Sequence, residues 1–177
     1  MALSLTLFSE SNTMNFKTPD LCDAFESELG KTLHVVAPMF KRYGARESFS
    51  GRISTLKLYE DNTLVRTVFA EDGSGKVLVI DGGGSMRCAL VGDQLAALAH
   101  KNGWEGVVVY GCIRDSGIIN SVDIGVRALD THPQRSLKKG AGERDLAVTF
   151  GGVRFVPGDF LYADEDGVLV SSQELHG

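Results

Sequence analysis

The chain has 177 residues, of which 43% are hydrophobic and 23% are charged, and its formal net charge is −5. This length suits one domain with a substantial core. The basic residues are scattered, which argues against direct binding of nucleic acid, and no run approaches the roughly 20 apolar residues that cross a bilayer.

The cysteines and histidines argue against two further kinds of site. Three widely spaced cysteines without a CxxC pair predict neither a disulfide framework nor a zinc site, and the four histidines show no ligand spacing. Cys112 lies two residues before Arg114, and we interpret it as a buried thiol rather than a reactive one. The expected location is the cytoplasm, without membrane contact.

Residues 1–17 form a polar leader that we exclude from the expected fold. The leader lacks the basic start and the small-residue cleavage site of a secretory signal. Thr18 and Pro19 then predict a helix that runs to about Leu29, with Thr18 as N-cap and Pro19 at the first helical position. Residues 18–177 are expected to form a single domain.

Turn residues and alternating hydrophobicity predict the elements up to residue 75. These are an extended piece at Leu33–Val36, a strand at Gly51–Tyr59, a short helix that Asp61 and Asn62 cap and that ends near Ala70, and a turn at residues 72–75.

The central stretch predicts a strand, a loop, a helix and a second strand. Lys76–Ile80 is a buried strand that ends in a glycine loop, Gly82–Gly84. Gly92 and Asp93 open an amphipathic helix for which Gly103 is the expected stop.

The second strand, Val107–Tyr110, leads into Arg114 and Asp115. Since the two strands are expected to be neighbours in one sheet, they place the glycine loop, the helix start, the arginine and two aspartates at one edge. Function in open α/β layers tends to lie at such an edge.

The second half is expected to be rich in strands. A connector (Ile118–Val122), a strand (Gly125–Leu129), a long loop (Pro133–Glu143) and two hairpins (Leu146–Val156 and Phe160–Ser171) follow in that order. Many strands with few helices in mixed order predict an α+β layered fold rather than a repeating βαβ arrangement.

Two motif interpretations fail on spacing. Gly82 and Gly84 follow a strand as in a dinucleotide fingerprint, but Arg87 occupies the position of the third glycine. The acidic run Asp164–Gly167 lacks the remaining ligands and the closing glutamate of a calcium loop, so a hairpin turn is the better interpretation.

A third interpretation is an anion-plus-metal site. Backbone N–H groups at the helix start, Gly92–Leu95, suit a carboxylate, and Arg114 adds a bidentate clamp. Asp115 is a hard oxygen ligand of the kind that magnesium or manganese binds. The residues alone leave an alternative open, in which Asp93 is only a helix cap and Arg114 with Asp115 only a surface ion pair.

Four segments together decide between these alternatives. They read DGGGSMRCALVGDQLA, GWEGVVVYGCIRD, DIGVRAL and GDFLYADEDGVLVS, and through them the chain resembles the RraA-like family over residues 18–171. This family includes class II 4-hydroxy-4-methyl-2-oxoglutarate aldolases and regulators of ribonuclease E. The aldolase branch has an aspartate, twenty intervening residues and then Arg-Asp, a spacing that Asp93 and Arg114-Asp115 match. The regulators typically lack these residues.

The resemblance implies a single β/β/α domain of the swivelling type and a homotrimer with active sites between subunits. It implies a divalent cation, Mg²⁺ or Mn²⁺, that Asp115 holds largely through water and that stabilises a pyruvate enolate as a Lewis acid. It also implies that Arg114 holds oxygens of a small 2-oxo acid. Asp93 would position or deprotonate a water beside the metal that serves as acid and base. The substrate-binding residues that it implies are Gly92, Asp93, Gln94, Leu95 and Arg114, and the catalytic residues are Asp93 and Arg114.

The same enolate forms when oxaloacetate loses carbon dioxide, so decarboxylation is a further expected activity. The only nearby lysine is Lys101 on the predicted helix, which argues against a Schiff base. The alternative function is a non-catalytic protein that binds a ribonuclease of the ribonuclease E type and inhibits it.

Overall fold

The computed structural model of the protein describes residues 15–176, so residues 1–14 of the predicted leader lie outside the described part. The helices are α1 (Thr18–Ala24), α2 (Thr63–Phe69), α3 (Asp93–Lys101) and α4 (Ser116–Ile119), with a 3-10 turn η1 at Glu26–Glu28. The strands of the first half are β1 (Leu33–Val35), β2 (Lys41–Tyr43), β3 (Phe49–Lys57), β4 (Lys76–Asp81), β5 (Ala89–Val91) and β6 (Gly106–Ile113). Those of the second half are β7 (Gly125–Thr131), β8 (Glu143–Arg144), β9 (Val148–Phe150), β10 (Val153–Phe155), β11 (Phe160–Ala163) and β12 (Val168–Ser171).

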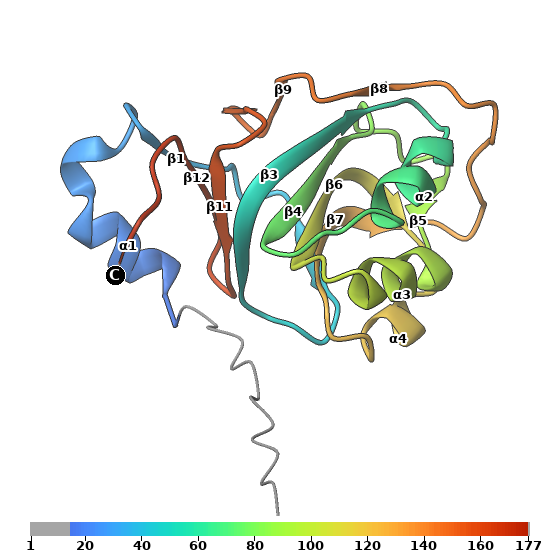
Figure 1. Ribbon diagram of the computed structural model, residues 1–177, viewed down its shortest axis with the longest axis horizontal. Helices are drawn as coiled ribbons and strands as arrows, with labels where there is room; N and C mark the ends of the chain where they lie inside the picture. The colour runs from blue at the N-terminus through green and yellow to red at the C-terminus, as the bar shows by residue number, and fades with distance from the viewer. Residues whose placement is uncertain (1–14, 177) are drawn as a thin grey trace, which may run out of the picture.

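A mixed ten-stranded sheet forms the centre of the molecule. Its strands follow the order β1-β12-β11-β3-β4-β6-β7-β2, while β5 pairs with β6 and β8 with β3. The neighbours β3, β4, β6 and β7 run parallel, and the outer pairings are antiparallel. Helices α2, α3 and α4 pack against one face of the sheet (Figure 1). The prediction of an α+β layered domain is therefore confirmed.

The central strands are buried on both faces. All four residues from Val77 to Ile80 have 0% exposure, as expected of parallel strands covered on each side. Leu78 and Ile80 pack with the residues of α2 and α3, whereas Val77 and Val79 pack with the hairpin β9–β10 and with β11 and β12. The continuous apolar run in the sequence thus reflects two cores, one on each face of the sheet.

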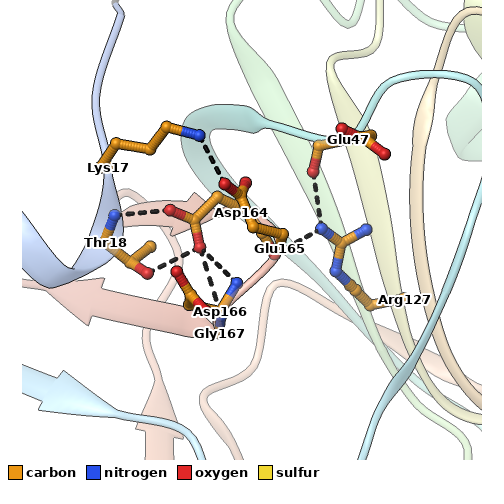
Figure 2. Close-up of polar contacts among 8 residues, drawn as sticks. All are labelled: Lys17, Thr18, Glu47, Arg127, Asp164, Glu165, Asp166 and Gly167. Carbon is orange, nitrogen blue, oxygen red and sulfur yellow. Dashed lines mark hydrogen bonds and ion pairs between the residues drawn. The ribbon is translucent and has the colours of Figure 1, made fainter.

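The start of α1 differs from the prediction. Lys17 is the N-cap and Thr18 is the first helical residue. The Thr18 hydroxyl does not cap the helix, because it donates to the carboxylate of Asp164 at 2.6 Å. Figure 2 shows this contact together with the backbone N–H of Thr18, which donates to the same carboxylate.

The end of α1 was also predicted wrongly. The helix stops at Ala24, and Phe25 has φ −115° and ψ 32°, outside the helical region. Phe25 packs against a third core cluster, which contains Phe16 and Tyr162. Phe25 packs against this cluster, and the helix does not continue to Leu29. The cluster also contains Phe16, which belongs to the predicted leader.

A buried aspartate orders the long loop after β7. Asp61, 3% exposed, accepts hydrogen bonds from Thr63, which starts α2, and from the N–H groups of Lys139 and Ala141. Burial raises the pKa of this carboxyl, but these donors outweigh burial and lower the pKa to about 2. The predicted cap of α2 therefore also fixes a loop 78 residues away in sequence.

No helix within residues 15–176 is long and apolar enough to cross a bilayer.

Candidate active site

Parallel pairing brings the predicted site residues to one edge of the sheet. Strands β4 and β6 are neighbours, and β5 continues beside β6 with Val91 opposite Ile113. The N–H of Arg114 donates to the carbonyl oxygen of Val91 at 3.0 Å. Gly92 follows β5 and Arg114 follows β6, so the two residues lie side by side. The sequence predicted this for the helix start and the arginine.

Asp115 adopts a left-handed backbone conformation. Its φ is 58° and its ψ is 35°, a region that residues other than glycine visit rarely and that is frequent at functional sites. This conformation turns the chain from β6 into α4. It also leaves the Asp115 carboxylate 3.4 Å from the backbone nitrogen of Asp93.

Gly92 allows this close approach. A Cβ at residue 92 would lie 2.9 Å from Asp115 Oδ2 and 3.5 Å from Arg114 Nε. The φ of Gly92 is −118°, so its backbone would accept another residue. The reason for glycine at this position is the space that the two side chains occupy.

The start of α3 presents free and occupied N–H groups. The N–H of Ala96 donates to the Gly92 oxygen and closes the first turn, so the N–H groups before it have no partner in the helix. Asp93 Oδ1 accepts from the N–H of Gln94 at 2.8 Å. The N–H of Leu95 has no partner among the described residues. Gly92 is the N-cap residue of α3, and Asp93, the first residue of the helix, occupies the N–H of Gln94 with its own carboxylate.

The Arg114 guanidinium is only loosely held. Its Nε is 3.7 Å from Asp115 Oδ2, and the two side chains are 40% and 37% exposed. An exposed pair at this distance contributes little to stability. The geometry leaves the donors of Arg114 free for a ligand, which favours a binding role over a structural ion pair.

The glycine loop does not take part in this arrangement. The N–H groups of Gly82 and Gly84 donate to the Tyr110 oxygen, and the N–H of Gly83 donates to Asp81 Oδ1. Arg87 makes a two-point ion pair with Glu60 at 2.7 and 2.9 Å. The N–H groups of the loop therefore donate to oxygens of the protein itself. This arrangement is consistent with the sequence interpretation, which rejected a dinucleotide site.

A family model described as RraA-like, Aldolase/RraA, matches residues 18–170. The chain belongs to the RraA-like family. Its curated relatives include a protein of Dechloromonas aromatica that is 77% identical over 162 residues, which are 92% of this chain and 99% of the relative. A protein of Aromatoleum aromaticum is 63% identical with the same coverage. Both carry the name "Putative 4-hydroxy-4-methyl-2-oxoglutarate aldolase".

Two solved RraA-like structures share the fold at a TM-score of 0.86. One, from Geobacillus kaustophilus, is described as S-adenosylmethionine:2-dimethylmenaquinone methyltransferase, is 48% identical, and aligns over 90% of this chain and 97% of its own. The other, from Thermus thermophilus, is described as the RNA-processing inhibitor RraA and is 44% identical over 93% and 97%. The fold expected of an RraA-like chain is confirmed.

The donor set of this RraA-like chain fits a hydrated hard cation. Residues 15–176 contain no group of three or more histidine, cysteine, aspartate or glutamate side chains that is placed to hold a metal ion, whereas a protein zinc site needs three or four such ligands. Mg²⁺ and Mn²⁺ differ from zinc in this respect, because one or two carboxylates and several waters are enough to bind them. Asp115, half exposed and beside Asp93, supplies such a carboxylate.

The candidate site is partly exposed in a single chain. Two pockets, of about 1100 and 490 Å³, lie elsewhere on the surface, and neither is lined by Asp93, Arg114 or Asp115. Substrate-binding sites normally enclose most of a small ligand. In the described chain alone, the side chains of Arg114 and Asp115 are partly open to solvent at this edge.

Proposed function

We propose that the protein is a divalent-metal-dependent class II pyruvate aldolase that cleaves 4-hydroxy-4-methyl-2-oxoglutarate into two molecules of pyruvate, and that it also decarboxylates oxaloacetate. The observation that carries the proposal is the meeting of Arg114 and Asp115 with the start of α3 at one sheet edge. The names of relatives up to 77% identical support the aldolase part of this proposal.

Substrate binding is assigned to two groups of donors. The N–H of Leu95 and the positive end of the α3 dipole suit the pyruvyl carboxylate. To bind there in full, that carboxylate displaces Asp93 Oδ1 from the N–H of Gln94. Arg114, whose guanidinium is loosely held, takes the neighbouring substrate oxygens in a bidentate contact.

Cleavage requires one proton to leave and one to return. The C4 hydroxyl loses its proton, the C3–C4 bond breaks, C4 becomes the carbonyl of one pyruvate, and the electron pair passes to the enolate of the other. A proton added at C3 then completes the second pyruvate. We assign both transfers to Asp93 and a water beside it, because displacement from Gln94 frees its carboxylate for this role.

Asp115 is the residue that would hold the cation, and the cation supplies a Lewis acid to the pyruvyl oxygens when it is bound. Lysine chemistry is disfavoured by position. Lys101 is the last residue of α3, eight positions after Asp93, which corresponds to about 12 Å along the helix. A Schiff base therefore has no suitable amine among the residues of this edge.

The assembly in the proposal is a homotrimer in the cytoplasm with active sites between subunits. Its support is the partial exposure of Arg114 and Asp115, which a neighbouring chain would cover. The second candidate function, inhibition of a ribonuclease of the ribonuclease E type, rests on the 44% identity with the Thermus thermophilus RNA-processing inhibitor. The exposed N–H donors of Arg114 are available to a substrate, which favours the catalytic function over the inhibitor function.

The test is release of pyruvate from 4-hydroxy-4-methyl-2-oxoglutarate and from oxaloacetate by the purified full-length chain. We expect turnover of both with Mg²⁺ or Mn²⁺ and loss of turnover in EDTA that added metal restores. Absence of turnover of either substrate with either metal would overturn the proposal. Inhibition of a ribonuclease by the same preparation would then favour the second candidate.

Gly92→Ala tests the close approach that defines the site. The added Cβ would push the carboxylate of Asp115, and we expect kcat/KM for pyruvate release to fall by about 10²-fold, because small displacements of positioned groups have effects of this size. The matched control is Gly117→Ala in α4, where a Cβ meets no atom within 4 Å. Equal activity of the two variants would contradict the assigned geometry.

A further inference from the structure

Two arginines lie directly opposite each other at the edge of the sheet away from β1. Strands β2 and β7 pair antiparallel with Arg42 opposite Arg127. Like charges in directly opposed positions destabilise a sheet. The pairing therefore needs a compensating interaction, and its surroundings show which kind.

Arg127 is a buried cation without a carboxylate partner. It is 2% exposed, and its terminal nitrogens donate to the main-chain oxygens of Val126, Glu47 and Asp164 at 3.1, 2.7 and 2.9 Å. Figure 2 shows the Glu47 and Asp164 contacts. Its guanidinium also lies 5.1 Å from the centre of the Phe49 ring. These groups orient the guanidinium, and none of them is a carboxylate oxygen.

The charge of Arg127 persists at neutral pH. Burial and then the positive charge of Arg42 lower the pKa of its guanidinium to about 10, although nearby carboxylates raise it, and this pKa is still well above neutrality. Among the described residues, neither Arg42 nor Arg127 has a carboxylate within ion-pair distance. Carboxylates of Asp164, Glu47 and Glu165 raise the pKa of Arg127 without forming an ion pair, so its charge is only partly balanced.

A pocket of about 490 Å³ opens at this pair, and both arginines line it. The Lys41 ammonium at its rim is 2.7 Å from Asp130, so its charge is already matched. The Asn120 carbonyl oxygen accepts from the N–H of Gly44, which leaves the Asn120 amide N–H groups available. Glu47 is the only acidic residue of the lining, and Arg127 contacts its main-chain oxygen.

We propose that this pocket binds a small oxyanion, a carboxylate or a phosphate, between the guanidinium groups of Arg42 and Arg127. The guanidinium fork of Arg42 matches the paired oxygens of both anions, and Arg127, whose position is fixed by main-chain oxygens, contributes positive charge beside it. The pocket shares no lining residue with the Arg114 edge. The site is therefore separate from the proposed reaction and does not depend on it.

Isothermal titration of the full-length chain with inorganic phosphate and with malonate, at matched ionic strength in chloride, tests the proposal. The two titrations show whether phosphate or a dicarboxylate is the preferred anion. Arg42→Gln, at an exposed position, is expected to weaken binding by about tenfold or more, the size of a lost charge-assisted hydrogen bond. Arg42→Lys keeps the charge without the fork and is expected to lose part of the affinity.

Two controls separate this pocket from other positive groups. Arg66→Gln removes an exposed arginine of α2, and Arg114→Gln removes the arginine of the candidate active site. Arg66→Gln is expected to bind the anion as the wild type does, and Arg114→Gln is expected to keep the binding that depends on Arg42, whatever it loses at the candidate active site. Binding that Arg42→Gln leaves unchanged, or that Arg114→Gln abolishes, would overturn the proposal, as would absence of binding of either anion.

Discussion

Replacement of Asp115 by asparagine is expected to reduce kcat/KM for pyruvate release by at least about 10³-fold, since it removes the negative charge that the proposed cation needs. Asparagine is the informative substitution because it tolerates the left-handed backbone that Asp115 adopts, at φ 58°. The fold should therefore be retained, and the loss reports on charge rather than on strain.

Arg114→Lys is the companion change at the same edge. Lysine keeps the positive charge but loses the planar fork that binds two oxygens together. We expect kcat/KM to fall by about 10²-fold, the usual size for removal of a positioned donor. Steady-state kinetics on both variants, with far-UV circular dichroism to verify folding, provides the measurement.

Asp166→Asn is the matched control for Asp115→Asn. Asp166 is an exposed aspartate in the β11–β12 turn, and its change should leave turnover unaltered. Retention of more than about a tenth of the activity in Asp115→Asn would contradict the role assigned to Asp115. Titration of both aspartate variants with Mn²⁺ shows whether the activity is lost through metal binding or through a later step. Asp115→Asn should bind Mn²⁺ more weakly than Asp166→Asn.

The frame of the site could be predicted because its signals are local. A run of buried β-branched residues before Asp81 and another before Arg114 identify two strands, and Gly92 with Asp93 identifies the helix start. Parallel pairing of β4 with β6 then brings the ends together. Strand β5 was missed because Ala89–Val91 has only three residues, too few for a period to show.

Other features depend on contacts between distant residues. The left-handed conformation of Asp115 and its distance to Asp93 follow from the turn into α4, which has no sequence signature. The opposition of Arg42 and Arg127 requires the register of two strands whose paired residues are 85 positions apart along the chain. The loss of Thr18 as a cap likewise required knowledge of Asp164.

Fold similarity alone does not decide between functions in this family. Structures with the same TM-score of 0.86 are described as a methyltransferase and as an RNA-processing inhibitor, whereas close relatives of this chain carry the name of an aldolase. Function resides in the site rather than in the layers that support it. The exposed, loosely held Arg114 beside Asp115 is therefore the discriminating feature to test.

A second large effect is expected on stability, at Asp164. This residue is 1% exposed, and its carboxylate accepts from the N–H and the hydroxyl of Thr18, both at 2.6 Å, and from the N–H groups of Asp166 and Gly167. Its main-chain oxygen accepts from Arg127. Figure 2 shows how these contacts join the start of α1 to the β11–β12 turn and to the buried guanidinium.

Asp164→Ala is expected to lower the free energy of unfolding by about 3 kcal/mol, because it leaves several buried donors without an acceptor. Urea unfolding at neutral pH measures this change. The matched control is Asp166→Ala on the same turn, whose exposed side chain should contribute within about 0.5 kcal/mol. Equal destabilisation by both variants would contradict the role of the Asp164 carboxylate.

The free energy of unfolding is also expected to depend on the ionisation of Asp164 at acidic pH. Burial raises the pKa of this carboxyl, but the Thr18 hydroxyl and the three N–H groups outweigh burial and hold the pKa below its ordinary value of 3.8. A lowered pKa contributes stability that is fully present above the ordinary value and is lost as the pH falls through the folded-state pKa. The wild type should therefore lose more stability in this acid range than Asp164→Ala, so the two unfolding free energies converge there. A difference that stays constant from neutral pH into this range would show that packing, rather than the carboxylate charge, holds α1 to the turn.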